Sequence, residues 1–457
     1  MPDSVWTESA SGADALFTDL YELTMLRAYS ELGMRDIAVF DLFFRKLPPQ
    51  RNYLLACGLN PFLQDLENLS FSGTDLAYLS SHPLFPETFI DQLRDFRFTG
   101  DVYAVPEGTP VFPNEPLLEI AAPIGQAQII ETMALNQIGL QTILASKAAR
   151  IVEAAQGRPV IDFGARRAQG LDAAVKGARA FFIAGAAATS NLAAGQRWGI
   201  PVAGTMAHSF VQACASEAEA FRDFARVFPG TTLLVDTYDT LEGVRRVVEL
   251  AKELGPNCRI QGVRLDSGDL AALAKGTRSI LDAAGLQDLQ IFASGGLDEY
   301  RITELLMAEA PIDAFGVGTS MSVSEDAPAL DIAYKLVEYA GVGRMKLSPG
   351  KCTLPGRKQI FRAMRNGLAE GDVIARGSEH RDGSPLLQPV MLSGRRVAPA
   401  PALAEIREHA RRSIEQLPGG LRMVKASTSP YPISVSDDLQ DYEQDVRRKL
   451  TASSKLE

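Results

Sequence analysis

Short polar stretches follow several apolar runs in the middle third of the chain. One run, PVAGTMAHS, carries His208 near its end, and the chain has only four histidines in 457 residues. Beside anion-binding groups, a histidine can accept a phosphoryl group as a nucleophile or act as a general acid or base. A lone histidine is also a common structural residue, so the neighbouring sequence must decide between the two interpretations.

The stretch VRLDSGD supplies a candidate pair, Arg264 and Asp266. Residues two apart on a strand project from the same face, and a buried strand tolerates both charges only when they pair or face a ligand. The arginine would hold an anion, and the aspartate would accept hydrogen bonds from sugar hydroxyls or bind a metal. A structural ion pair is the alternative. At another strand end, DFGARR adds an aromatic ring and a further positive charge, Phe163 and Arg166.

Glycine-rich turns end two later runs, QIFASGG and AFGVGTS. Backbone amides in such a turn can point at an anion, and glycine lets a phosphate approach closely. Ser294, Gly295, Gly318 and Thr319 are therefore candidate phosphate-binding residues. Plain tight turns are the alternative, but two neighbouring turns of this kind favour phosphate. Asp236, at the end of TTLLVD, adds a carboxylate that is either structural or functional.

The elements that must position these residues are buried strands alternating with helices. Continuous Val, Ile and Leu runs indicate strands of a parallel sheet, and the alternation indicates repeated β-α units whose ligands bind at the carboxyl ends of the strands. A closed or nearly closed α/β barrel suits six such units better than an open sheet, and we place it at 125–345. The six runs are 159–167, 201–209, 231–239, 260–269, 290–296 and 314–320.

The remaining segments, 1–124 and 346–457, are expected to pack together as a second, mixed α/β domain. With 46 Lys+Arg against 56 Asp+Glu, the net charge of −10 argues against nucleic acid or an anionic membrane as the main partner. The four cysteines are scattered, which suggests neither a zinc site nor a disulfide framework. No signal peptide or membrane-spanning run is apparent, so we expect a cytoplasmic protein.

Eight stretches, in this order and spacing over about residues 14–425, resemble the nicotinate phosphoribosyltransferases. The resemblance implies an enzyme that joins nicotinate to 5-phosphoribosyl 1-diphosphate. The products are nicotinate mononucleotide, which enters NAD salvage, and diphosphate. The resemblance also implies ATP hydrolysis through a phosphohistidine, Mg²⁺ bound with the diphosphate, and an irregular, TIM-like barrel of the type II phosphoribosyltransferase kind. A homodimer with shared active sites is implied too. The stretches are TDLYELTM, FFRKLP, DFGARR, GTMAHSF, VDTYDT, VRLDSGD, FGVGTS and SPGKCTLPGRKQIFR.

The same resemblance implies a role for each candidate residue. His208 would be the phosphohistidine, and Asp266 would hold the ribose hydroxyls. Nicotinate would contact Phe163, Thr205 and Arg264, with Tyr21 reaching it from the other subunit. The phosphoribosyl and diphosphate groups would contact Arg45, Arg166, Ser294, Gly295, Gly318 and Thr319, with Arg45 from the other chain. No metal is expected to bind the protein directly.

Other functions stay open from the sequence. A related barrel enzyme using nicotinamide or quinolinate is the first alternative. Nicotinamide users carry an aspartate that accepts the amide hydrogen bond, and we place that position near Ala187, where no acid stands. A phosphosugar aldolase or isomerase would need a lysine or a base pair at strand ends, and the six ends hold no lysine. A non-catalytic scaffold would not need buried Arg, Asp and His at one rim.

Overall fold

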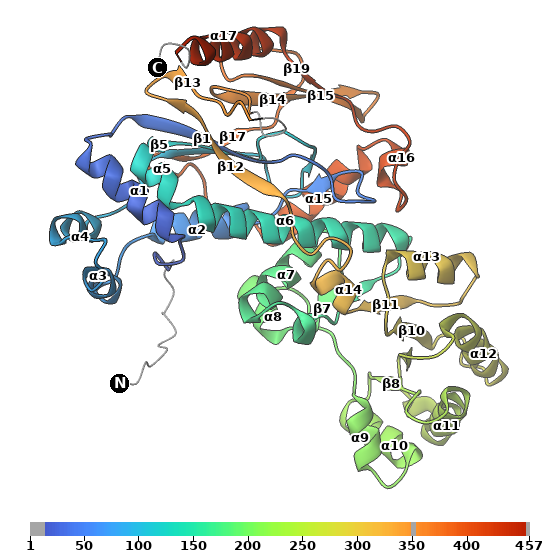
Figure 1. Ribbon diagram of the computed structural model, residues 1–457. Coiled ribbons are helices and arrows are strands. Elements are labelled where there is room, and N and C mark those ends of the chain that lie inside the picture. The colour runs from blue at the N-terminus through green and yellow to red at the C-terminus, as the bar shows by residue number, and fades with distance from the viewer. Residues whose placement is uncertain (1–13, 349–352, 454–457) are drawn as a thin grey trace. The chain divides into compact units, whose positions relative to one another are not determined.

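The computed structural model describes residues 14–348 and 353–453. The chain forms two compact units, each described here by itself (Figure 1). Unit 1 is formed by the described parts of Met1–Thr142, Ala329–Leu421 and Ser427–Glu457, and unit 2 by Ile143–Pro328 and Arg422–Ala426. The boundaries expected at 125 and 345 therefore differ from those of the structure, which gives 125–142 and 329–345 to unit 1.

A seven-stranded sheet forms the centre of unit 1. Its strand order is β13-β12-β1-β5-β3-β17-β18, and β1 pairs antiparallel with both β12 and β5. The pairing of β1 with β12 explains why 329–345 leaves the predicted barrel. The strands are β1 (Ile37–Phe44), β3 (Asp101–Ala104), β5 (Leu118–Pro123), β12 (Ile332–Tyr339), β13 (Val342–Gly343), β17 (Gln388–Leu392) and β18 (Arg395–Arg396).

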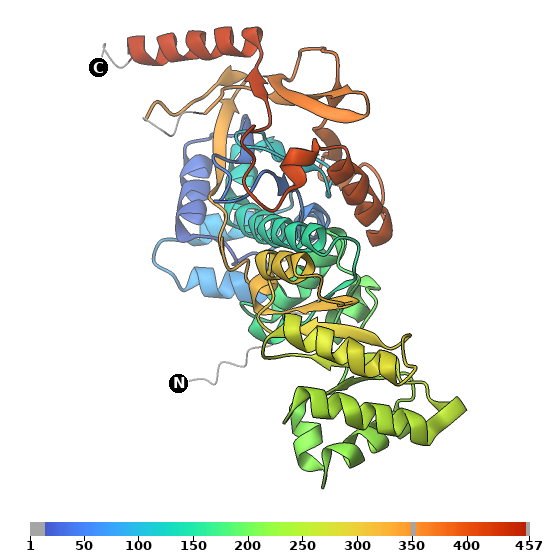
Figure 2. The ribbon, with the colours of Figure 1, turned by 90° about the vertical axis from the view of Figure 1, so that its right-hand side faces the viewer.

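A four-stranded sheet, ordered β16-β14-β15-β19, is the second layer of strands in unit 1. The helix α17 (Asp437–Ser453) lies along β15, as the turned view shows (Figure 2). The strands are β14 (Lys358–Arg365), β15 (Leu368–Arg376), β16 (Ser384–Pro385) and β19 (Ile433–Val435), and the short β2 (Leu54–Leu55) and β4 (Pro110–Val111) pair separately.

Helices complete unit 1. The boundary between the units falls within the long helix α6 (Glu131–Ala154). The stretch ALAEIREHARRSIEQL forms α15. The helices are α1 (Leu20–Glu31), α2 (Leu59–Asn68), α3 (Gly73–Ser80), α4 (Glu87–Arg94), α5 (Ile124–Ile129), α15 (Leu403–Glu415) and α16 (Gly419–Arg422).

Unit 2 is built on a six-stranded parallel sheet in the order β7-β6-β11-β10-β9-β8. Parallel strands that alternate with helices confirm the α/β class and five of the six predicted runs. The strands are β6 (Val160–Asp162), β7 (Ala188–Thr189), β8 (Thr232–Leu234), β9 (Gly262–Leu265), β10 (Gln290–Ser294) and β11 (Ala314–Val317).

The helices of unit 2 connect these strands, and α11, α12 and α13 lie along the outside of the curved sheet (Figure 1). They are α7 (Leu171–Ile183), α8 (Leu192–Trp198), α9 (His208–Ala213), α10 (Glu217–Val227), α11 (Thr240–Leu254), α12 (Leu270–Ala283), α13 (Glu299–Met307) and α14 (Thr319–Ser322), with 3-10 turns η1 (Ala165–Arg167) and η2 (Gly255–Asn257).

The sheet is curved but its ladder of hydrogen bonds does not close. The run 201–209 was predicted as a strand. In the structure it makes a single isolated bridge, between Val202 and Thr189 of β7, and the described residues show no pairing between Val202 and β8. Val202 is exposed, so this segment lacks the burial on both faces that a central parallel strand needs. Full closure into a barrel is therefore not seen in this ladder.

Candidate functional site

The carboxyl ends of the parallel strands in unit 2 hold most of the predicted site residues. Arg264 lies on β9, Asp266 follows that strand directly, and Ser294 ends β10. Phe163 follows β6, which lies on the other side of β11. Because the strands are parallel, their carboxyl ends meet at one edge of the sheet, and the structure does bring these side chains together.

Arg264 is the centre of a partly satisfied polar network. Its Nη2 donates to the carbonyl of Met206 at 2.7 Å, and its Nη1 lies 3.3 Å from both Asp266 Oδ1 and Ser294 Oγ. The Ser294 hydroxyl donates in turn to Asp266 Oδ1. Arg264 Nε is buried and has no partner among the described residues. One donor of the guanidinium is therefore available to a ligand.

Burial lowers the pKa of Arg264, and the nearby carboxylates of Asp266 and Asp236 offset this only in part. The positive charge of Arg166, which lies exposed on η1, lowers the pKa further. An anion placed between the two arginines would relieve this unfavourable electrostatic environment. The edge of the sheet is thus suited to a negatively charged group.

Phe163 supplies an aromatic face beside this network. The Arg264 guanidinium carbon lies 5.9 Å from the centre of the Phe163 ring, and the Phe292 ring lies 5.7 Å from it on another side. Gly316 on β11 makes room for the ring, because a Cβ there would stand 2.8 Å from two Phe163 ring atoms. Sequence reasoning treated the glycines of AFGVGTS as a phosphate turn and missed this role of the first one.

His208 begins α9 and remains 41% exposed. Its Nδ1 lies 3.1 Å from Thr237 Oγ1. Its Nε2 lies 4.0 Å from Asp236 Oδ1 and 4.0 Å from Asp266 Oδ2, beyond hydrogen-bonding distance of either. Thr237 therefore holds the ring through Nδ1, and the nearest carboxylates do not hydrogen-bond to Nε2.

Asp236 has a clearer role than the sequence gave reason to expect. Its side chain is 1% exposed, and its Oδ2 accepts from the Asp266 backbone amide at 3.0 Å and from the Ser267 hydroxyl at 2.6 Å. Its Oδ1, on the side of His208, has no partner among the described residues. Asp236 thus fixes the segment that carries Asp266 and also faces the histidine. The run VDTYD was the signal for both Asp236 and Thr237.

The two glycine turns differ in what they require. Gly295 has φ +87°, and a Cβ there would meet the Asp266 carbonyl oxygen at 1.8 Å. Gly318, which precedes Thr319 at the start of α14, has φ −109°, and a Cβ there would meet nothing closer than 3.5 Å. Gly295 is therefore needed for the close approach of two backbone segments. Phosphate binding at either turn stays a prediction.

Three sequence models of one family match the chain. The nicotinate phosphoribosyltransferase N-terminal domain matches residues 16–139, the family's central model matches 159–351, and its C-terminal domain matches 379–443. The chain is 56% identical to nicotinate phosphoribosyltransferase pncB2 of Mycobacterium tuberculosis over 93% of its own length and 92% of that protein. The chain belongs to the nicotinate phosphoribosyltransferase family.

More distant members and solved structures agree with this assignment to the nicotinate phosphoribosyltransferase family. The Bacillus subtilis nicotinate phosphoribosyltransferase is 44% identical over 79% of this chain and 76% of its own. The crystal structure of human nicotinic acid phosphoribosyltransferase superposes with a TM-score of 0.83 at 29% identity, covering 94% of this chain and 99% of the human one.

Tyr21 and Arg45, which the nicotinate phosphoribosyltransferase resemblance assigns to the neighbouring subunit's site, belong to unit 1. Tyr21 lies on α1 and is 44% exposed, and burial together with the Glu131 carboxylate raises its pKa. Arg45 follows β1, with its guanidinium carbon 5.4 Å from the centre of the Phe43 ring, and its buried Nε has no partner among the described residues. Their part in the site stays a prediction.

Two further expectations concern residues around the edge of the sheet. Thr205 lies half-buried before α9, and its hydroxyl donates to the Met206 carbonyl at 3.4 Å. Ala187 lies before β7, level with the first residue of β6, and so away from the carboxyl edge. The residues that follow β7 at that edge are Ser190 and Asn191, which are not acidic.

Among the described residues, neither a membrane-spanning helix nor a cluster of metal-binding side chains is found. Within residues 14–348 and 353–453, no helix is both long and apolar enough to cross a bilayer. In the same part of the chain, no three His, Cys, Asp or Glu side chains gather as a metal ion would require.

Proposed function

We propose that this protein is a nicotinate phosphoribosyltransferase acting in NAD salvage. The nicotinate ring nitrogen would bond to the anomeric carbon of 5-phosphoribosyl 1-diphosphate as the bond to diphosphate breaks. The observation that supports this most directly is the Phe163 ring beside Arg264, whose buried Nε lacks a partner in the described chain. The pair matches a flat pyridine ring that carries a carboxylate.

The residues at the edge of the sheet each meet a need of this reaction. Loss of diphosphate builds positive charge on the sugar and negative charge on the leaving group, so the site must stabilise both. Asp266 is positioned by Asp236 and Ser294 to hold ribose hydroxyls and to balance the developing positive charge. Arg166 is exposed close enough to Arg264 to add positive charge for a phosphate.

Mg²⁺ would enter with the diphosphate rather than in a site built by the protein. Magnesium usually keeps several waters and is held by one or two carboxylates together with substrate phosphates. That pattern fits a rim with the carboxylates of Asp236 and Asp266 and no larger ligand cluster in the described residues. Bound there, the ion would supply positive charge to the leaving diphosphate.

We further propose that ATP phosphorylates His208 on Nε2. The ring is held through Nδ1 by Thr237, and the exposed Nε2 has no hydrogen bond that would have to break first. The nearest carboxylate oxygens, of Asp236 and Asp266, lie 4.0 Å from Nε2 and are not hydrogen-bonded to it.

Labelled ATP tests this step. Incubation with γ-labelled ATP should give a protein-bound phosphate that is lost in acid and stable in alkali, as a phosphoramidate is. The label should disappear in His208→Asn and remain in the matched control His380→Asn, since His380 is an exposed histidine of unit 1. If His208→Asn keeps the label at the wild-type level, the assignment is wrong.

Product analysis tests the function itself. The protein is incubated with 5-phosphoribosyl 1-diphosphate, Mg²⁺ and ATP, and with nicotinate, nicotinamide or quinolinate in separate reactions. Nicotinate should be used at least tenfold to a hundredfold better than nicotinamide, since a hydrogen bond to a charged group contributes about 1.5–3 kcal/mol. Comparable kcat/KM values for nicotinate and nicotinamide, or a preference for quinolinate, would replace the proposal with one of the alternatives.

A further inference from the structure

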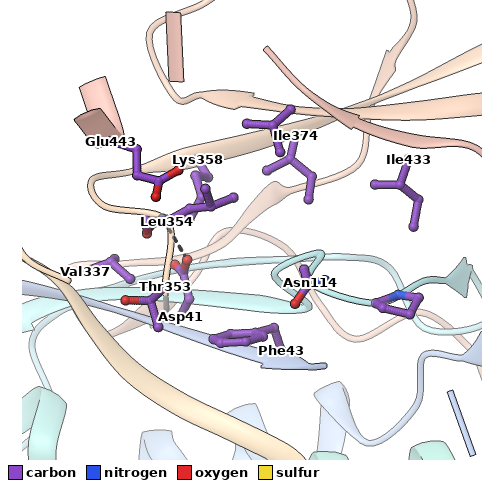
Figure 3. Close-up of a pocket in the computed structure, with 12 residues that line it drawn as sticks. Asp41, Phe43, Asn114, Val337, Thr353, Leu354, Lys358, Ile374, Ile433 and Glu443 are labelled. Atoms are coloured by element: carbon purple, nitrogen blue, oxygen red, sulfur yellow. Dashed lines mark hydrogen bonds and ion pairs between the residues drawn. The ribbon is translucent and has the colours of Figure 1, made fainter. Parts of the chain in front are cut away.

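A cavity of about 380 Å³ lies inside unit 1, outside the edge of the parallel sheet (Figure 3). Asp41 and Phe43 of β1 line it from the seven-stranded sheet, and Ile374 of β15 and Ile433 of β19 line it from the four-stranded sheet. Its size falls in the lower part of the range of about 300–1,000 Å³ that small-molecule sites occupy. It is large enough for a single-ring molecule.

A buried ion pair lies at the wall of this cavity, and only one of its partners is fully bonded. Lys358 Nζ lies 2.9 Å from Asp41 Oδ2 and also donates to the carbonyls of Leu354, at 2.9 Å, and Gly356. An ammonium has three protons, so Lys358 has none left for a ligand. Asp41 Oδ1 is buried and has no partner among the described residues.

The environment makes the unbonded oxygen of Asp41 unfavourable as it stands. The side chain is almost completely buried, and burial raises its pKa to about 7 even though Lys358 acts in the opposite direction. An unsatisfied buried acceptor costs free energy that a hydrogen-bond donor would recover. No described residue supplies that donor, so a molecule in the cavity, water included, can supply it.

The charges around the cavity limit what that molecule can be. An anion would meet Asp41 and also Glu443, a second carboxylate in the wall, with no free lysine proton to bind it. A cation would find no carboxylate without a cationic partner, because Asp41 pairs with Lys358 and Glu443 pairs with Arg447. Most of the other lining side chains are apolar, except for Thr353 and the exposed amide of Asn114, which faces the open space across from Asp41 (Figure 3).

We propose that the cavity between the two sheets of unit 1 binds a small uncharged aromatic amide. The amide N–H would donate to Asp41 Oδ1, and the amide oxygen would accept from the Asn114 side chain. The ring would lie among Phe43, Ile374 and Ile433. This site would differ from the edge of the parallel sheet in its chemistry, because it offers no free positive charge to a carboxylate or phosphate.

Three probes of similar size distinguish the possible charges of the ligand. Benzamide is uncharged, benzoate is an anion and benzylamine is a cation, and each carries one benzene ring. Their binding to the whole protein is measured by calorimetry in the presence of saturating nicotinate mononucleotide, which competes for the proposed catalytic site. Benzamide should bind at least tenfold more tightly than either charged probe.

Two substitutions that fill the cavity test whether benzamide binds there. This test does not depend on the proposed function. Val435→Phe on β19 and Leu354→Phe before β14 each place an extra ring in the cavity from a different segment. Ser434→Phe is the matched control, because Ser434 is an exposed residue between the two cavity-lining residues of β19. Benzamide affinity should fall at least tenfold in the filled variants and should not change in Ser434→Phe.

Three results would overturn the proposal. They are no benzamide binding to the folded wild-type protein at 10 mM, tighter binding of benzoate or benzylamine than of benzamide, and wild-type benzamide affinity in either filled variant. The melting temperature of each variant shows that it is folded, and two independent filled variants guard against the loss of one. The 10 mM limit is about the weakest affinity expected for a single-ring ligand.

Discussion

Arg362 and Asp372 in unit 1 and Arg264 and Asp266 in unit 2 are both arginine–aspartate pairs, but their bonding differs. Arg362 meets Asp372 through Nε at 2.9 Å and through Nη2 at 2.6 Å, and Nη2 also donates to the Pro110 carbonyl. Arg264 reaches Asp266 through one contact of 3.3 Å and keeps Nε unpaired. The first pair is complete, and the second leaves bonding capacity for a ligand.

The surroundings of the two arginines extend the contrast. The Arg362 guanidinium carbon lies beside the stacked rings of Phe112 and Tyr431, 5.6 and 5.7 Å from their centres, and the Tyr431 hydroxyl donates to Asp372. Burial opposes the charge of Arg362, but the hydrogen bonds and charge of Asp372 outweigh it and raise the pKa. For Arg264, burial prevails and lowers the pKa. The two shifts thus have opposite directions, in keeping with the complete bonding of Arg362 and the incomplete bonding of Arg264.

The largest difference between the two pairs should appear in the stability of the protein when each arginine is removed. Arg362→Met leaves Asp372 buried and unpaired, so the free energy of unfolding should fall by about 3–5 kcal/mol. Arg264→Met leaves the partly exposed Asp266 open to water and should cost about 1 kcal/mol or less. Urea unfolding followed by circular dichroism measures both. Equal losses would contradict the distinction between the two pairs.

Activity should give the opposite order. Arg264→Lys keeps the charge but loses the planar fork that can hold a carboxylate, so kcat/KM for nicotinate should fall about tenfold to a hundredfold, which corresponds to 1.5–3 kcal/mol. Arg245→Lys is the matched control, because Arg245 forms an exposed pair with Glu242 on α11 of the same unit. Steady-state kinetics that show equal effects of both changes would remove Arg264 from the substrate site.

Two substitutions in the turn after β10 distinguish the cost of backbone strain from the effect of moving Asp266. Gly295 and Gly296 both have positive φ, and an alanine in that conformation costs about 1–2 kcal/mol at either position. Only at Gly295 would the added methyl group also meet the Asp266 carbonyl, since Gly296 has open space. Gly295→Ala should therefore lower kcat/KM strongly, whereas Gly296→Ala should lower stability alone. Similar kcat/KM values in the two variants would show that the position of Asp266 does not matter.

The sequence was sufficient to predict what local patterns determine. Buried apolar runs marked the strands of unit 2, and because parallel strands share one edge, Phe163, Arg264, Asp266 and Ser294 could be placed together in advance. The pairing of β12 with β1 joins segments about 300 residues apart. A pattern of neighbouring residues cannot predict such a pairing. For the same reason, the role of Gly316 depends on a ring from another strand and could not be seen from its own neighbours.

The smallest predicted effect concerns Tyr21, whose position in unit 1 contrasts with that of the other predicted nicotinate contacts in unit 2. If its ring stacks on nicotinate from the partner subunit, Tyr21→Ala should weaken nicotinate binding by about 0.5–1.5 kcal/mol beyond the lost burial. Tyr78→Ala is the matched control, because Tyr78 is an exposed tyrosine on α3 of the same unit. Calorimetric titration with nicotinate measures the difference.

Mixing two defective proteins decides whether Tyr21 acts in its own chain or in the partner's site. In a symmetric dimer with shared sites, combining Tyr21→Ala with His208→Asn subunits places both lesions in one site and leaves the other site intact. Each mixed dimer should therefore recover about half of the ATP-coupled wild-type activity, an estimate that follows from the two-fold symmetry. Subunit exchange is confirmed separately with differently tagged chains. If exchange occurs and the activity of the mixture stays at the average of the two variants, Tyr21 serves its own chain and the shared-site hypothesis is wrong.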